Sequence, residues 1–216
     1  MCGRYELHAN PAAIALAFGL AHTPSVRPRY NVAPMQEVPI VRVSASGARE
    51  LVAVRWGLVP RWAKDPAIGS KMINARGETV ATKPSFRTAF RRHRCLIPAT
   101  GFYEWEAVTS DGKVRKQPWY ISPAKAGEFF AFAGLLAAWT PPGGDTIVST
   151  CIITTAANEL MAPIHDRMPV ILPAEQHDAW LDPENRDTGA LQELLQPCLA
   201  TSMNADPVSP AINRGN

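Results

Sequence analysis

The chain has 216 residues, of which 46% are hydrophobic and 19% are charged, and its formal net charge at pH 7 is +3. This balance is typical of a soluble globular protein, and the length allows a substantial core. Without an apolar run of about 18 residues, a membrane-spanning helix is not expected. The first residues show no basic stretch followed by an apolar segment, so we expect a cytoplasmic protein without a secretory signal.

In chain order, the first predicted element is a helix that begins at Pro11, with Asn10 as its N-cap, and continues over residues 12–20. The next segment, 21–31, contains two prolines and is predicted to be irregular. Residues 38–43 and 51–56 predict a hairpin. Further strands are expected at 94–98, 102–107, 119–122, 129–136 and 146–154, with a turn at Asp111–Gly112. Helices are expected at 158–162, 173–181 and 188–195.

Many strands with helices around them indicate the α+β class. We expect a single domain over residues 1–216, with a largely antiparallel, barrel-like β core and peripheral helices. The four cysteines are far apart and form no C-x-x-C pair, so no metal site is expected. Because no glycine-rich phosphate-binding loop is found either, the sequence predicts no cofactor.

Basic residues are concentrated in one part of the chain. Residues 55–94 contain ten Lys or Arg but only two acidic residues. Such a block is what contact with a nucleic-acid backbone requires. A solvated basic face is the alternative explanation.

Cys2 becomes the N-terminal residue if the initiator Met1 is removed. It then carries an α-amine, with a reference pKa of about 7.7–8.0, and a thiol, with a reference pKa of about 8.5, so both are expected to be partly nucleophilic near neutral pH. An aldehyde that forms an imine with the amine can be closed by the thiol into a five-membered thiazolidine ring. The alternative is that a cysteine stands at position 2 by coincidence.

Three short polar clusters could assist this chemistry. Asn74 and Arg76 would share one face of a strand, where an amide can orient a nucleophile and a guanidinium can bind phosphate. Glu104 lies among aromatic residues and is a candidate for proton transfer. His165, followed by Asp166 and Arg167, is a candidate acid or base. Each could instead have a purely structural role.

Eight segments, in order along the chain, read MCGRY, RYNVAP, WGLVPRW, NARGET, RCLIPA, GFYEW, TTAAN and HDRMP. Together they closely resemble the SOS response-associated peptidase (SRAP) family and cover nearly the whole chain. Residues 207–213 also resemble the closing segment of that family.

The resemblance implies a protein of the DNA damage response that binds abasic sites in single-stranded DNA and links to them through Cys2. It implies that Asn74 orients Cys2, that Glu104 supports proton movement, and that His165 transfers a proton to or from the opened sugar. Phosphates would be bound by Arg4, Arg76 and Arg167, and the DNA path would be shaped by Asn31, Pro34, Trp62, Thr154 and Met168. A monomer that associates with the nucleoid during damage is expected, with replication-fork proteins as further partners.

Two other functions remain open from the sequence. One is an N-terminal-nucleophile cysteine peptidase in which Cys2 attacks a peptide carbonyl, including self-removal of Met1. The other is non-covalent binding of single strands through the basic block and tryptophans. A weak lyase activity is expected beside covalent capture, because an imine also promotes β-elimination of the strand.

Overall fold

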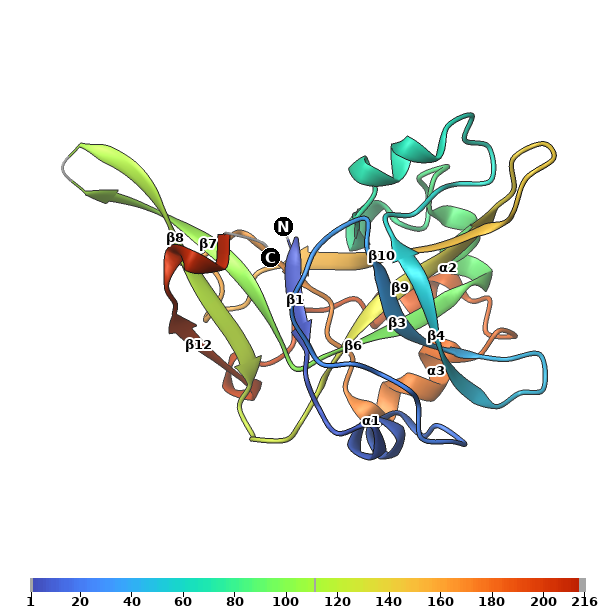
Figure 1. Cartoon of the computed structure of the whole chain (residues 1–216), viewed down its shortest axis with the longest axis horizontal. Coiled ribbons are helices and arrows are strands. Elements are labelled where there is room, and N and C mark those ends of the chain that lie inside the picture. Colours follow the sequence, from blue (N-terminus) through green and yellow to red (C-terminus); the bar gives the residue numbers. More distant parts are fainter. Residues whose placement is uncertain (1, 111, 214–216) are drawn as a thin grey trace.

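A computed structural model describes residues 2–110 and 112–213 and has two β-sheets with short helices around them (Figure 1). Five strands of the larger sheet close into a barrel in the order β10-β4-β3-β6-β9, because β9 also pairs with β10. All of these pairings are antiparallel except β10 with β4. The expected α+β class with a largely antiparallel, barrel-like core is confirmed.

The barrel strands are those whose sequences are most apolar. Nearly every residue of β6, β9 and β10 is buried, as expected for strands that are covered on both faces. The predicted hairpin is confirmed, with Glu37 opposite Arg55 and Val43 opposite Arg49. The barrel strands are β3 (Glu37–Val43), β4 (Arg49–Trp56), β6 (Arg94–Ala99), β9 (Phe130–Trp139) and β10 (Ile147–Ala156).

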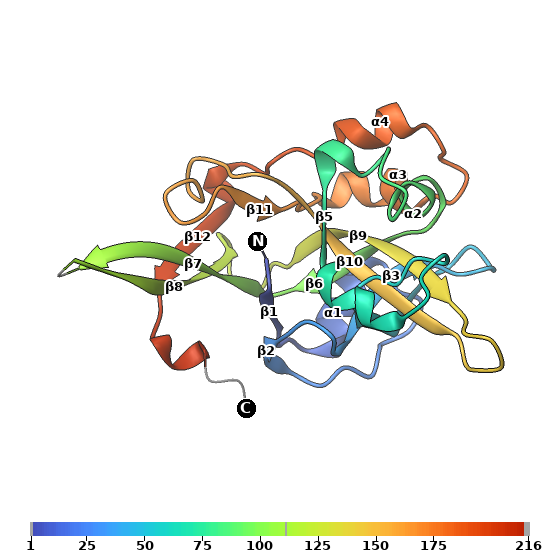
Figure 2. The same cartoon turned by 90° about the horizontal axis from the view of Figure 1, so that it is seen from above.

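The second sheet has the order β12-β8-β7-β1-β2 and lies at one side of the barrel. Its strands β7 and β8 form a long hairpin that projects from the body (Figures 1 and 2). Asp111, in the turn predicted for this hairpin, lies outside the described residues. The sheet consists of β1 (Arg4–Leu7), β2 (Arg29–Val32), β7 (Gly101–Ser110), β8 (Lys113–Pro123) and β12 (Met203–Pro207).

The helices are short and peripheral. Asn10 caps α1 as predicted, because its side chain accepts a hydrogen bond from the Ala12 backbone N–H at 2.9 Å, and Gly19 ends the helix with φ of 63°. The helices are α1 (Pro11–Phe18), α2 (Arg87–Arg92), α3 (His177–Leu181) and α4 (Thr188–Glu193). Short 3₁₀ segments are η1 (Pro66–Lys71), η2 (Gly77–Thr79), η3 (Ala174–Gln176), η4 (Ala200–Ser202) and η5 (Pro210–Asn213).

Several local predictions are wrong. Residues 158–162 form no helix but lead into a run of turns, because Pro163 lacks a backbone N–H and disfavours the helical conformation at Ala162. The segment expected to be irregular ends in β2, which pairs with β1. The short strands β5 (Asn74–Arg76) and β11 (Arg167–Pro169), like β2 and β12, are stabilised by partners distant in sequence.

Two large buried apolar clusters divide the interior of the described part of the chain. One lies between the barrel and the helices, and includes Phe18, Phe90 and Trp180. The other lies between the barrel and the second sheet, and includes Cys2, Tyr5 and Phe102. Cys2 is therefore packed into the core between the two sheets. Among the described residues, no helix is long and apolar enough to cross a membrane.

The connection from β4 to β5 depends on two facing glycines. A Cβ on Gly57 would lie 2.8 Å from the Gly69 carbonyl oxygen, and a Cβ on Gly69 would lie 2.6 Å from that of Gly57. Gly57 also has a φ of 133°, which L side chains rarely adopt. This close approach holds residues 57–73 against the end of the barrel and so positions β5.

Candidate functional site

Cys2 is brought next to Glu104 by strand pairing. In the register between β1 and β7, Arg4 lies opposite Tyr103. Cys2 is fully buried, and its backbone carbonyl accepts a hydrogen bond from Asn74 Nδ2 at 3.0 Å. Asn74 is itself held by β5, where it pairs with Ile152 of β10. Residues 2 and 74 are thus fixed against each other from two different sheets.

The other atom of the Asn74 amide is an unused acceptor. Asn74 Oδ1 is buried and has no hydrogen-bond partner within residues 2–110 and 112–213. A buried polar atom without a partner carries a cost of about 1–3 kcal/mol, so such atoms often mark a functional site. Because the amide contacts Cys2, this oxygen is an acceptor available beside the N-terminal residue.

Burial changes the state of the Cys2 thiol. Its pKa is raised far above the usual value, chiefly by desolvation and secondly by the negative charge of Glu104. The partial ionisation expected near neutral pH refers to a solvated Cys2 at the chain terminus, whereas the raised pKa is that of the buried Cys2 that follows Met1. The thiol is held as a neutral S–H until a base or a reacting partner removes its proton.

Glu104 and His165 face a common opening. Both line an open depression of about 440 Å³ together with Trp105, Lys116 and Asn213. Glu104 is only 4% exposed, and its Oε1 accepts a hydrogen bond from the Trp105 backbone N–H at 3.3 Å. A buried carboxylate and an imidazole thus border the same space, next to a buried N-terminal cysteine. We call Cys2, Asn74, Glu104 and His165 the N-terminal centre.

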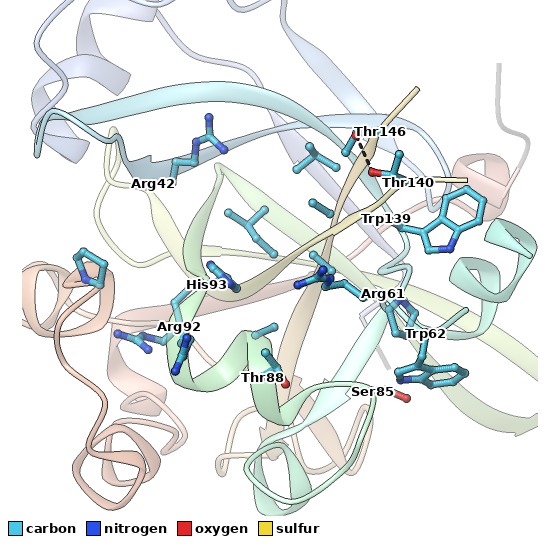
Figure 3. A pocket seen from close by; sticks show the side chains of 18 of the residues that line it. Arg42, Arg61, Trp62, Ser85, Thr88, Arg92, His93, Trp139, Thr140 and Thr146 are labelled. Atoms are coloured by element: carbon cyan, nitrogen blue, oxygen red, sulfur yellow. Dashed lines mark hydrogen bonds between the residues drawn. The ribbon is translucent and has the colours of Figure 1, made fainter. Parts of the chain in front are cut away.

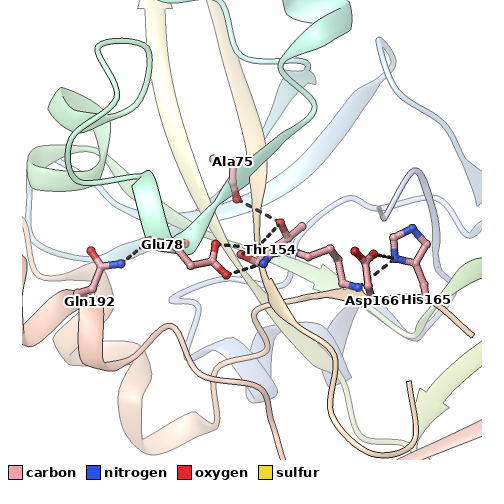
Figure 4. A network of polar contacts seen from close by, with 8 residues as sticks. Ala75, Glu78, Thr154, His165, Asp166 and Gln192 are labelled. Atoms are coloured by element: carbon pink, nitrogen blue, oxygen red, sulfur yellow. Dashed lines mark hydrogen bonds and ion pairs between the residues drawn. The ribbon is translucent and has the colours of Figure 1, made fainter. Parts of the chain in front are cut away.

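The His165 ring has two competing contacts. Its Nδ1 lies 2.8 Å from Asp166 Oδ1 and accepts a hydrogen bond from the Arg167 backbone N–H at 3.0 Å (Figure 4). The contact with the carboxylate needs a proton on Nδ1, whereas the contact with the N–H needs a lone pair there. One arrangement of ring protons therefore cannot satisfy both contacts fully.

Arg167 is held by partners beside this histidine. Its guanidinium donates to both carboxylate oxygens of Glu78, to the Thr154 carbonyl at 2.7 Å and to the Thr154 hydroxyl at 3.3 Å (Figure 4). This network ties β11 to β10 and to η2. Glu78 is the residue that sequence reasoning missed here, because only the folded chain brings it to Arg167.

Arg4 and Asn31 also contact each other. Arg4 donates to Asn31 Oδ1 at 2.6 Å, and Asn31 Nδ2 donates to the Ile212 carbonyl at 3.3 Å. Asn213 accepts from the Trp105 indole N–H at 2.8 Å. The C-terminal residues 212 and 213 therefore border the N-terminal centre, although about 200 residues separate them from Arg4 in sequence.

The remaining residues of the expected DNA path differ in how far they are exposed to solvent. Pro34 is partly buried and Arg76 is exposed, whereas Thr154 and Met168 are fully buried. Trp62 is 56% exposed and lines a different hollow, beside α2. Lys116, which lines the depression beside Glu104, was missed by sequence reasoning. Its position could have been found from the register of the β7–β8 hairpin, in which Lys116 lies opposite Ala107.

The site of this fold is a buried cysteine at position 2 whose backbone is held by an asparagine amide, beside a buried carboxylate and a histidine. Among the described residues, no group of three or more His, Cys, Asp or Glu could hold a metal ion. The chain belongs to the SOS response associated peptidase (SRAP) family, whose family model matches residues 1–215.

Similar proteins include the abasic site processing protein YoqW of Bacillus subtilis, which is 45% identical with 99% of this chain and 94% of the relative covered. The abasic site processing protein HMCES of Rattus norvegicus is 30% identical, with 99% and 72% covered. A crystal structure of a protein from Bacteroides thetaiotaomicron matches with a TM-score of 0.88 and 27% identity, covering 100% of this chain and 95% of that one.

Proposed function

We propose that this protein captures abasic sites in single-stranded DNA by forming a thiazolidine between the opened sugar and Cys2 after Met1 has been removed. The observation that carries the proposal is the N-terminal centre, in which Asn74 holds the Cys2 carbonyl at 3.0 Å while Glu104 and His165 line one depression. The names of two relatives, which are called abasic site processing proteins, support the same substrate.

The α-amine reacts first in this mechanism. Its nitrogen attacks the aldehyde carbon, and the resulting carbinolamine loses water to give an imine. Asn74 Oδ1, a buried acceptor without a partner among the described residues, is suited to receive an N–H of this amine and to aim its lone pair. Glu104 is suited to stabilise the positive charge that develops when the imine is protonated.

The thiol then closes the ring. Its sulfur adds to the imine carbon, so a C–S bond forms, the C=N bond becomes single and the thiol proton is lost. Overall, aldehyde, amine and thiol give thiazolidine and one water. Because burial and Glu104 raise the pKa of the thiol, its proton must pass to a nearby base as the bond forms, and Glu104 is the candidate. His165 would protonate the ring oxygen as the sugar opens and remove that proton when the link reverses.

The phosphates beside the lesion would be bound by Arg4, Arg76 and Arg167, and Asn31, Pro34, Trp62, Thr154 and Met168 would shape the strand path. Arg76 is exposed, which suits direct contact. Thr154 and Met168 are buried, so we assign them the support of their neighbours rather than direct contact.

The proposal is tested by intact mass spectrometry of the protein with and without an abasic single strand. The protein alone should lack the mass of Met1, and the adduct should equal protein plus DNA minus one water. Cys2→Ala keeps an α-amine but has no thiol, so it should form an imine that only borohydride preserves on heating. Cys198→Ala, which removes a partly buried cysteine, is the control. A heat-stable adduct with Cys2→Ala would refute ring closure.

A peptidase that attacks through the Cys2 thiolate is the second candidate, and the description of the family favours it. The raised pKa of this thiol argues against a thiolate acting first. Self-removal of Met1 and weak strand cleavage from the imine are compatible with the first proposal. Cleavage of unrelated peptides that is lost in Cys2→Ala would favour the peptidase.

A further inference from the structure

A second hollow, distinct from the N-terminal centre, lies between α2, the turn after β4 and the facing ends of β9 and β10 (Figure 3). Its volume is about 730 Å³. Among the described residues, its lining contains no aspartate or glutamate, but it contains Arg42, Arg61, Arg92, His93 and Arg94. We call this hollow the basic pocket.

The five cationic or titratable side chains are not equally available. Arg94 is used by the fold, because it donates to the carbonyls of Trp180 and Asp182 at 2.6 Å each. Arg42 is paired with Glu50 at 2.8 Å. By contrast, Arg61 and Arg92 have no hydrogen-bond or ion-pair partner within the described parts of the chain, so their charges are free for a ligand.

The positive charges of the basic pocket lie close enough together to act on one side chain, His93. The pKa of His93 is lowered by burial and then by the charges of Arg92, Arg94 and Arg61, which come from two different segments. The charges of three arginines therefore converge on one imidazole. An anion bound in the basic pocket would offset the repulsion between Arg61 and Arg92, which ends α2.

The pocket also offers hydroxyl and aromatic groups. Ser85 lies just before α2 and Thr88 in its first turn, whereas Thr140 follows β9 and Thr146 precedes β10, and these two hydroxyls hydrogen-bond each other at 2.7 Å (Figure 3). Trp62 is 56% exposed at the pocket. The turn that carries Arg61 and Trp62 is held against β9, because the Trp139 indole donates a hydrogen bond to the Ala63 carbonyl at 2.7 Å. Free guanidinium groups, hydroxyls and an exposed indole are the groups that bind a phosphate with its adjoining base.

We infer that the basic pocket binds a phosphate of the DNA strand that flanks the lesion, through Arg61 and Arg92, with the adjoining base on Trp62. This inference rests on the proposed function for the identity of the strand. The distance between the basic pocket and the N-terminal centre suits one strand that contacts both. Val148 of β10 lines the pocket, and Ile152, four residues further along the same strand, pairs with Asn74. At about 3.3 Å per residue this is roughly 13 Å, which a stacked strand spans in about four nucleotides.

The test compares abasic oligonucleotides with two or with twelve flanking nucleotides on each side. The double variant Arg61→Gln with Arg92→Gln should weaken binding of the long strand about tenfold and reduce its salt slope by about 0.7, the value for one phosphate contact on a single strand. Crosslinking of the short strand should be unchanged, because it does not reach the pocket. Melting temperatures should match the parent, since both side chains are exposed.

A charge-matched control is Lys64→Gln with Arg91→Gln. These exposed residues lie in the same loop and the same helix but do not line the pocket. Equal weakening by the pocket pair and the control pair would overturn the inference, as would equal loss with short and long strands. If the pocket pair lost binding of inorganic phosphate or a mononucleotide but bound the long strand normally, the ligand would be a small phosphate compound and the DNA assignment would be wrong.

Failure of the proposed function would be seen separately. In that case the parent protein would give no adduct with either abasic strand. Fluorescence anisotropy with an intact strand of the longer length would still test the basic pocket, since that measurement requires no aldehyde.

Discussion

The N-terminal centre and the basic pocket differ in how they hold their polar groups. In the centre, Cys2 and Glu104 are buried, and Asn74 holds the Cys2 backbone. In the pocket, Arg61 and Arg92 are exposed and have no partner among the described residues. Bond formation needs reacting atoms in fixed positions, whereas phosphate affinity gains most from charges that have no partner inside the protein. The difference indicates one region built for reaction and another for affinity.

Replacing the buried Glu104 carboxylate should have the largest effect on reaction in the N-terminal centre. We expect Glu104→Gln to slow adduct formation about 100-fold, the lower range for loss of a general acid or base. Because the charge of Glu104 raises the pKa of the Cys2 thiol, the variant should ionise that thiol at lower pH. Alkylation rates of Cys2 measured against pH would check the shift, and quenched crosslinking time courses would check the rate.

The control for this variant is Glu106→Gln, which alters a carboxylate that accepts from the Trp119 indole at 2.9 Å. It should leave both the rate and the alkylation profile unchanged. Should Glu104→Gln slow crosslinking without moving the alkylation profile, the electrostatic coupling between Glu104 and the thiol would be wrong.

A smaller effect is expected from Asn74→Ala. Loss of the hydrogen bond to the Cys2 carbonyl, worth about 1.5 kcal/mol, corresponds to roughly tenfold slower capture. Binding of an intact strand should be unaffected, because the basic pocket and Arg4 remain. Single-turnover crosslinking and anisotropy would measure these two properties. Equal loss in both would mean that Asn74 supports the DNA path rather than Cys2.

The smallest effect, on stability, is expected from Glu78→Gln. This variant removes the partner of Arg167, which is paired, whereas Arg61 and Arg92 in the basic pocket are not paired within the described residues. The Arg167 hydrogen bonds lower the pKa of Glu78, so this pair stabilises the fold above the ordinary glutamate pKa and less as pH falls through the lowered value. Glu78 is 53% exposed on its side chain, so Glu78→Gln should cost at most about 1 kcal/mol at pH 7. Urea unfolding at pH 7 and pH 3 should show the difference shrinking in acid, and a constant difference would contradict it.

The sequence was most informative where local patterns were strong. Long apolar segments predicted β9 and β10, and Asn10-Pro11 predicted the start of α1, because burial and capping depend on neighbouring residues. It was least informative for β2, β5, β11 and β12, which are three to five residues long and depend on partners elsewhere. Such strands have no local pattern long enough to identify them.

By itself the sequence determined the α+β class, the family and the residues of the N-terminal centre as candidates. Tertiary structure alone decided that Cys2 is buried with a raised thiol pKa, because desolvation depends on the second sheet packing over it. It also decided which arginines are free. Arg61, Arg92 and Arg94 look alike in one basic block, yet only folding brings carbonyl groups to Arg94 and leaves the other two exposed.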